Sequence, residues 1–136
     1  MDVQLLYLIN LLLSAFMCGV IWIVQILIYP SFRLVKDNRH HQFHMKAISY
    51  VVMPAMILEL AGLIYFYFLT SDPLVLLALV LLFLTWLSTF FVQVPQHQRI
   101  QLETTDQSIN KLISSNWIRT ILWSAKTLLL LWYGNA

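Results

Sequence analysis

Charged side chains inside apolar stretches are the residues of this sequence best suited to chemistry. Glu59 is the one charged residue of one such stretch, and Arg119 and Lys126 lie in another. An intramembrane charge costs on the order of 2.5–3.5 kcal/mol on insertion scales, so such residues face an interior and have partners. A buried carboxylate can accept a proton, and a guanidinium can stabilise negative charge that develops on an oxygen. We therefore predict Glu59, Arg119 and Lys126 as catalytic residues.

A buried ion pair is a second interpretation of two of these residues. At the rise of an α-helix, Glu59 lies roughly 20 Å from the start of its helix, and Lys126 lies at a comparable depth in the last one. An unpaired buried charge would be neutralised, so pairing is the simplest account of both residues. The pair would be structural and fix the register of two helices. In the functional alternative, Glu59 is a proton acceptor or a metal ligand.

Polar residues gather on one face of the last apolar segment. Helical spacing places six of them on one side, namely Asn116, Arg119, Thr120, Trp123, Lys126 and Thr127. We predict Asn116, Trp123 and Gln93 as cofactor-binding residues, with the indole of Trp123 as a stacking wall.

Arg119 is expected in the first turns of its helix, where the helix dipole is positive. A cation there needs something anionic nearby, unless its side chain simply extends to the membrane surface. The candidates are Glu103, Asp106, a lipid phosphate, and an anionic or carbonyl-bearing ligand.

Four histidines lie near the ends of apolar segments: His40, His41, His44 and His97. If the second helix begins near Asn38, His44 lies one turn from both His40 and His41. Neutral imidazole is a common metal ligand, and two on one turn can share a metal. We predict His41, His44 and His97 as ligands of a metal ion such as iron, copper or zinc. Axial ligation of a haem and solvated histidines without a ligand are the alternatives.

The composition places these residues in a membrane protein. Of the 136 residues, 60% are hydrophobic and 10% are charged, whereas a soluble domain carries about 25% charged residues. The mean hydropathy is +0.77. A net charge of +2 without a basic run argues against a nucleic-acid partner. The single cysteine, Cys18, excludes an intrachain disulfide.

Four apolar segments are long enough to cross a bilayer, for which about 20 residues suffice. We predict spans over 3–29, 47–69, 74–94 and 112–133, within one integral-membrane domain over residues 1–136. Pro30 and Pro95 are expected to end the first and third spans, and Pro54 to kink the second. The first segment is expected to stay in place as a helix, because it is longer than the apolar region of a signal peptide. The predicted fold is an all-α, four-helix transmembrane bundle with short connections.

Basic residues predict the orientation of this bundle. They lie in or beside the first and third connections, at Arg33, Lys36, Arg39, Lys46, Arg99 and Lys111. The second connection and both termini have none. By the positive-inside rule, the two basic connections are cytoplasmic and both termini are outside, in a multi-pass protein of the cell membrane.

Three short motifs lie where the predicted helices begin or end. They are Tyr29-Pro30, Val94-Pro95-Gln96-His97 and Asn116-Trp117-Ile118-Arg119-Thr120. In order and spacing they resemble the anthrone-oxygenase-like family of small four-helix membrane proteins, most members of which have no assigned activity. That family often has Asn after the proline region and His ahead of the Arg, where this chain has Gln96-His97 and Asn116. The resemblance implies oxidation of an apolar aromatic compound with little use of cofactors, with His97, Asn116 and Arg119 as the carried-over positions.

Two function classes follow from these observations. In the first, a polar pocket toward the cytoplasmic side binds a metal or a lipophilic small molecule, and redox chemistry would make the chain an oxidoreductase. The sequence leaves open whether it is an enzyme. In the second, the chain is a structural or accessory subunit of a larger membrane complex or a homo-oligomer, and its polar stripes hold helices together. A channel or transporter is less favoured, because no inverted repeat is visible.

Overall fold

The computed structural model describes residues 2–135, which form four long helical rods. The first rod consists of α1 (Val3–Ile23), a π-helical turn (Val24–Ile28) and α2 (Tyr29–Ser31). The second rod is α3 (Asn38–Thr70). The third rod consists of α4 (Pro73–Ser88), a second π-helical turn (Thr89–Gln93) and α5 (Val94–Leu102), and the fourth is α6 (Asp106–Tyr133). Residues 2–135 contain no strand, so the predicted all-α class is confirmed.

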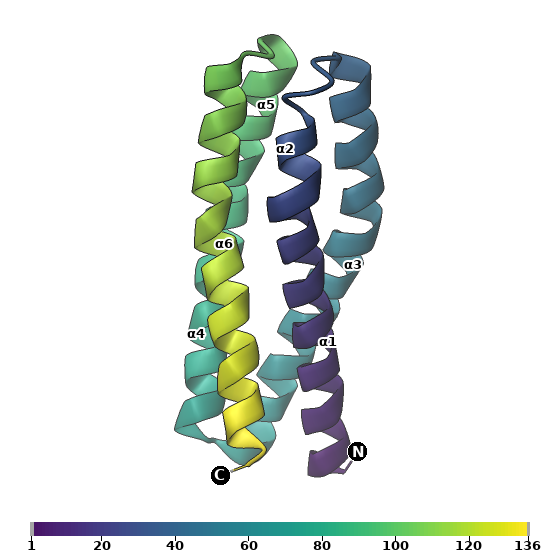
Figure 1. The fold of residues 1–136 in the computed structure, drawn as a ribbon. Coiled ribbons are helices and arrows are strands. Elements are labelled where there is room, and N and C mark those ends of the chain that lie inside the picture. The colour runs from purple at the N-terminus through teal and green to yellow at the C-terminus, as the bar shows by residue number, and fades with distance from the viewer. Residues whose placement is uncertain (1, 136) are drawn as a thin grey trace.

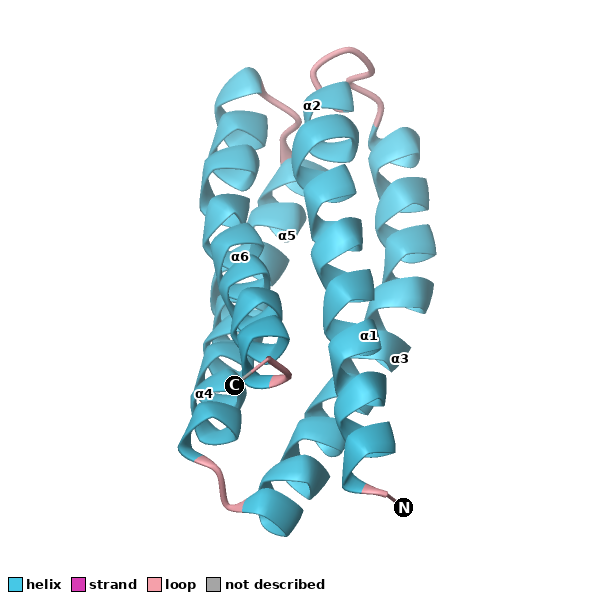
Figure 2. Ribbon diagram, turned by 60° about the horizontal axis from the view of Figure 1, so that its bottom comes forward, coloured by secondary structure: helices cyan, strands magenta, loops and turns pink. Residues whose placement is uncertain are grey.

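The rods form an antiparallel bundle in which each packs against two neighbours. α1 packs on α3 and α6, and α4 packs on the same two helices (Figure 1). The two ends of the chain lie at the same end of the bundle, and α3 passes behind α1 in its lower half (Figures 1 and 2). We call the half of the bundle nearest the chain ends the terminal half, and the other the basic half. Side chains of α1 and α4, or of α3 and α6, can therefore meet only across the centre.

The turn between α3 and α4 is stabilised by local contacts. Ser71 adopts a left-handed conformation, with φ of 50°. The side chain of Asp72 accepts a hydrogen bond of 2.7 Å from the backbone N–H of Leu74. Pro73 occupies the first turn of α4, where its missing N–H costs nothing. The turn thus ends one rod and starts the next within a few residues.

The predicted end of the third span is wrong, because that helix continues through Pro95 to Leu102, whereas the first rod ends at Ser31, one residue past Pro30. The residue before each proline belongs to a π-type hydrogen bond: Tyr29 N–H donates to Val24 O, and Val94 N–H donates to Thr89 O. A proline has no N–H to donate and normally leaves a carbonyl one turn earlier without a partner. The widened turn absorbs this defect, so that the helix can go on. The second and fourth helices begin before the predicted spans, at Asn38, the start considered for the histidine spacing, and at Asp106.

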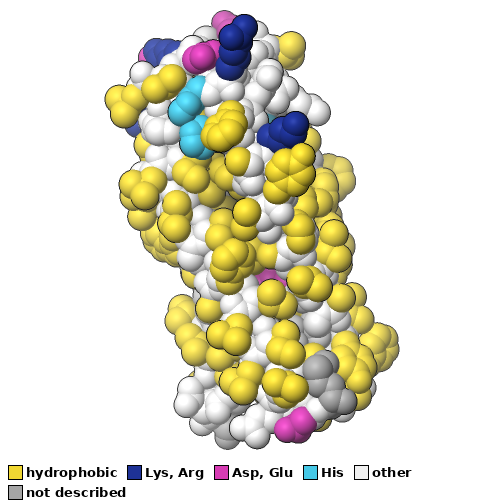
Figure 3. Space-filling view, turned by 90° about the vertical axis from the view of Figure 1, so that its right-hand side faces the viewer, with side chains coloured by type: hydrophobic (Ala, Val, Ile, Leu, Met, Phe, Trp, Pro, Cys, Tyr) yellow, Lys and Arg dark blue, Asp and Glu magenta, His cyan; other side chains and the backbone are white. Residues whose placement is uncertain are grey.

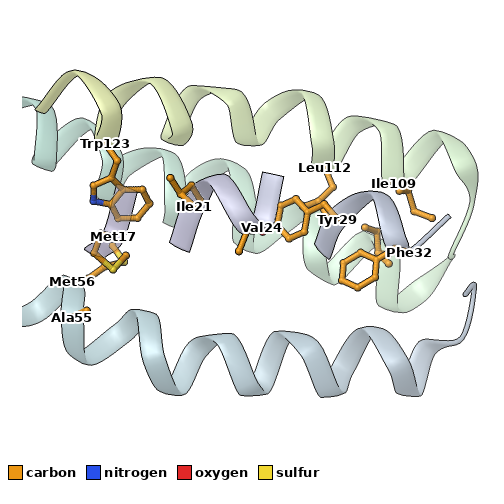
Figure 4. Packing of buried hydrophobic residues seen from close by; sticks show 11 residues of the cluster. Met17, Ile21, Val24, Tyr29, Phe32, Ala55, Met56, Ile109, Leu112 and Trp123 are labelled. Carbon is orange, nitrogen blue, oxygen red and sulfur yellow. The ribbon is translucent and has the colours of Figure 1, made fainter. Parts of the chain in front are cut away.

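Buried apolar side chains form one cluster in each half of the bundle. The cluster of the basic half includes Met17, Tyr29, Phe32, Met56 and Trp123 (Figure 4). The cluster of the terminal half consists of Leu6, Leu63, Phe66, Val75, Ala78, Leu82 and Leu130. The polar residues discussed below lie between and beside these two clusters.

Three rods, Val3–Ser31, Asn38–Thr70 and Pro73–Leu102, are long and apolar enough to cross a membrane. The fourth rod does not reach the same mean hydropathy, because it carries a polar stripe. That stripe lies inside the bundle. Its outward residues are apolar, with Ile121 61% and Leu128 65% exposed. Figure 3 shows the same kind of surface on another side, where hydrophobic side chains form a broad band and Lys, Arg and His lie at one end. The predicted span 112–133 thus has a lipid-compatible outer face.

Candidate functional site

Glu59 and Lys126 form an ion pair across the centre of the bundle. Lys126 Nζ donates to Glu59 Oε1, and both side chains are fully buried. The second carboxylate oxygen, Oε2, accepts a hydrogen bond of 3.1 Å from the indole N–H of Trp123. The predicted pairing is therefore confirmed. The pair joins the diagonally opposed helices α3 and α6, which fixes their register.

Arg119 is buried among neutral oxygens. Its Nε donates to Asn116 Oδ1 at 2.9 Å, and its Nη2 donates to the hydroxyl of Tyr29 at 3.0 Å and to Gln93 Oε1 at 3.3 Å. Its relative exposure is 7%. Within residues 2–135, the ion pairs are Glu59–Lys126 and Lys36–Asp106, so Arg119 has no carboxylate partner there.

Of the expected anionic neighbours of Arg119, the two carboxylates, Glu103 and Asp106, are wrong, because neither pairs with it. Asp106 pairs with Lys36 at 2.9 Å on the surface, and both side chains there are largely exposed. The helix dipole acts mainly within the first turn of a helix. Since α6 begins at Asp106, Arg119 lies well beyond that turn. The unfavourable free energy of Arg119 therefore comes from burial of its charge, and the helix dipole contributes little to it.

Two glutamines from the π-helical turns hold the residues around Arg119. Gln25 Oε1 accepts a hydrogen bond of 2.7 Å from Asn116 Nδ2, and Gln25 Nε2 donates to the carbonyl of Ile113 at 3.1 Å. Gln93 Nε2 donates to Ser115 Oγ at 2.9 Å. Both amides are therefore fixed at each end. Each π-helical turn buries its glutamine side chain inside the bundle. Such turns are frequent at functional sites.

A cavity of about 120 Å³ lies beside Arg119 in the basic half, between the first three rods and α6. Its wall is mostly apolar, with side chains such as Met17, Ile21, Val52 and Met56. Its polar lining residues are Tyr29, Ser49, Thr89, Gln93, His97 and Arg119. The indole ring of Trp123 forms another part of the wall. An apolar hollow with a few converging polar groups is the usual form of a small-molecule site.

The histidines do not form the predicted three-ligand set. His97 Nδ1 lies 3.4 Å from His41 Nε2, and His97 Nε2 lies 3.0 Å from the hydroxyl of Tyr29. His44 instead packs against His40, with ring centroids 4.4 Å apart. Residues 2–135 contain no group of three or more His, Cys, Asp or Glu side chains placed to hold a metal ion. The pair His41–His97 is buried, and it continues the polar chain from Arg119 through Tyr29.

The structure divides the predicted site residues into three groups. Gln93, His97, Arg119 and Trp123 line the cavity, and Asn116 holds the guanidinium from behind. Glu59 and Lys126 lie outside the cavity lining, beyond the indole of Trp123. His41 and His44 also lie outside it.

Sequence reasoning did not select Tyr29 and Gln25 as site residues. Both had a visible signal, because Asn10, Ser14, Gln25 and Tyr29 share one face of the first segment at helical spacing. Their partners on α6 could not be identified from the sequence, since the π-helical turn shifts the face that the end of the first rod presents.

Comparison with protein-family models, curated protein sequences and solved structures finds no match for this chain. The site must therefore be interpreted from its own geometry.

Proposed function

We propose that this chain is a membrane protein that binds a lipophilic small molecule in the cavity of its basic half. An acceptor oxygen on the head of that molecule would bind Arg119. The observation that supports this proposal best is that Arg119 lies on the cavity wall without a carboxylate among residues 2–135. The apolar remainder of the wall suits the apolar body of the ligand.

The energetics of Arg119 favour a ligand with an oxygen acceptor. Moving a cation out of water costs several kcal/mol, and neutral hydrogen-bond acceptors offset only part of that cost. Hydrogen bonds between a charged group and its partner contribute about 1.5–3 kcal/mol. Three neutral oxygens, from Asn116, Tyr29 and Gln93, hold the guanidinium in place before a ligand arrives. A preordered donor of this kind also suits the stabilisation of charge that develops on a ligand oxygen.

In this proposal the protein crosses the cell membrane four times, and α6 is the fourth span. The connection after the first rod and the one after the third rod would face the cytoplasm, since they carry the basic residues. The cavity then lies in the half of the bundle nearer the cytoplasm. The oxidoreductase activity, the metal ion and the homo-oligomer remain predictions, and the proposed binding requires none of them.

Binding measurements on the protein in mild detergent test this function. The probes are oleate, which has a carboxylate head, and 1,4-naphthoquinone, which has carbonyl oxygens. Isothermal titration calorimetry is expected to show binding of at least one probe to the wild type. Arg119→Gln should weaken that binding by about 10- to 100-fold, which corresponds to the loss of a charge-assisted hydrogen bond.

Arg33→Gln is the matched control, because Arg33 is an exposed arginine that donates to Asn110, and neither residue lines the cavity. It should bind the probes as the wild type does. Absence of binding for both probes, or equal loss in the two arginine variants, would overturn the proposed function. Loss of partners in step with loss of stability would instead favour the accessory-subunit interpretation.

A further inference from the structure

The cavity beside Arg119 has a side opening between α3 and the third rod. Its rim on α3 is a line of residues four apart, Met45, Ser49 and Met53, and its rim on the third rod is Phe90 and Val94. Ser49, Met53, Phe90 and Val94 are exposed at the surface while they line the cavity. We call these five residues the lateral slot. Since the slot lies on the side of the bundle and four of its five residues are apolar, it faces the lipid.

The stretch of α3 that borders the slot packs loosely on the bundle. From Asn38 to Pro54 the only buried residue is His41, whereas the following part of α3 buries Ala55, Met56, Glu59 and others. Figure 4 shows the same contrast, because the labelled α3 residues Ala55 and Met56 both lie at one end of the drawn helix. A second apolar groove, which includes Ile23, Ala47 and Val51, lies between this stretch and the first rod.

Pro54 divides the loose stretch of α3 from the packed one. It has no N–H to donate to the carbonyl of Tyr50, so the helix lacks one hydrogen bond there. At the far end of the stretch, His41 contacts His97 and packs edge-on against Phe32, with ring centroids 4.7 Å apart. The stretch is thus held at both ends, and its middle, where the slot lies, packs on the core through the partly buried side chains of Ile48 and Val52.

The size of the cavity limits what can lie inside it. A cavity of about 150 Å³ holds one benzene molecule. The cavity beside Arg119, at about 120 Å³, is no larger. A longer lipophile can place only its head and first carbons inside, and its remainder must pass through the slot.

The charge of Arg119 selects among possible heads. A carboxylate accepts two parallel hydrogen bonds from a guanidinium and neutralises its charge, which a carbonyl cannot do. We infer that the ligand is a single-chain amphiphile with a carboxylate head, which enters head first from the bilayer through the lateral slot and leaves its tail there. This inference rests on the proposed function of the cavity.

A labelling experiment tests the route. In a Cys18→Ser background, Ser49→Cys on the slot rim and Ser114→Cys on the exposed face of α6 are each reacted with N-cyclohexylmaleimide. Both are exposed serines, so both substitutions should be tolerated. The rate of oleate binding is then measured in phosphatidylcholine vesicles, from the change in tryptophan fluorescence.

The label at position 49 should slow oleate binding by at least about tenfold, whereas the label at position 114 should leave it unchanged. Equal rates for the two labelled proteins would overturn the lateral route and leave the cavity function standing. Binding of 1,4-naphthoquinone without binding of oleate would overturn the carboxylate head and also leave that function standing. Binding of neither probe to the unlabelled protein would overturn both proposals.

Discussion

Lys126 and Arg119 are two cations on the same face of α6, seven residues apart, but their partners and surroundings differ. Lys126 has a buried carboxylate partner in Glu59, and it lies outside the cavity lining. Arg119 has only neutral oxygens around it, and it lines a cavity. A charge that serves the fold is paired within the chain, and a charge without such a partner is available to a ligand.

The surroundings of the two cations differ in the same way. Beyond the ion pair, the terminal half has a continuous cluster whose members on α3, Leu63 and Phe66, are fully buried. In the basic half, the first part of α3, Asn38–Pro54, has one buried residue, His41. At 1.5 Å per residue this part of the helix is roughly 25 Å long. This difference in packing of α3 supports the proposal that the ligand binds in the basic half.

Removal of one member of the ion pair should give the largest effect on stability. Glu59→Gln leaves Lys126 buried without a counter-charge, which typically costs about 3–5 kcal/mol. Titration with sodium dodecyl sulfate in mixed micelles measures the free energy of unfolding. The double variant Glu59→Gln, Lys126→Met removes both charges and should recover most of the loss. A single variant as stable as the wild type would show that the pair does not maintain the fold.

Truncation of one apolar side chain in each half of α3 should show the difference in packing. Leu63→Ala, in the terminal half, should cost about 2–5 kcal/mol, because Leu63 is fully buried. Ile48→Ala, beside the cavity, should cost about 1 kcal/mol or less, since Ile48 is partly exposed. The same unfolding titration compares the two. Equal losses would contradict the contrast between the halves.

Two glycines provide a finer test of packing. A Cβ at Gly62 would lie 2.7 Å from Asn10 Oδ1, whereas a Cβ at Gly19 would meet nothing within 4 Å. Gly62→Ala should therefore destabilise the protein by about 1–3 kcal/mol. Gly19→Ala should be neutral or stabilising by up to about 1 kcal/mol, because alanine favours a helix. Thermal unfolding that ranks the two variants in the opposite order would contradict the close α1–α3 contact.

Arg119→Gln should give the smallest change in stability. The substitution removes a buried charge and retains an amide that can donate to Tyr29 or Asn116, so the free energy of unfolding should change by about 1 kcal/mol or less. Lys126→Gln, which is the same kind of change two turns along the helix, should cost about 3–5 kcal/mol. If the unfolding titration shows equal losses, Arg119 serves the fold as Lys126 does.

The sequence was sufficient to predict the four helices, the polar face of α6 and the pairing of Glu59 with Lys126. These features follow from apolar length, helical period and the cost of an unpaired buried charge. The continuation of the third rod beyond Pro95 could not be predicted, because the π-helical turn before that proline depends on tertiary packing.

The composition of the site was only partly predictable. Four of the predicted site residues, Gln93, His97, Arg119 and Trp123, line the cavity. His41 and His44 do not, because His41 contacts His97 and His44 packs against His40. Which histidines meet depends on the rotation of α3 and α5 about their axes, and sequence spacing within one helix does not fix that rotation between two.

The most direct test of the contrast between the two cations is the stability of the wild type against oleate concentration. Binding to the folded state alone stabilises a protein by about 2.7 kcal/mol at a ligand concentration 100 times the Kd. We expect the thermal unfolding midpoint of the wild type to rise with oleate. That of Arg119→Gln should start close to the wild-type value and rise much less, because binding weakened by about 10- to 100-fold leaves only about 0.4–1.4 kcal/mol of that stabilisation. Equal rises in the two proteins would show that oleate does not bind through Arg119, and would contradict the assignment of this unpaired cation to a ligand.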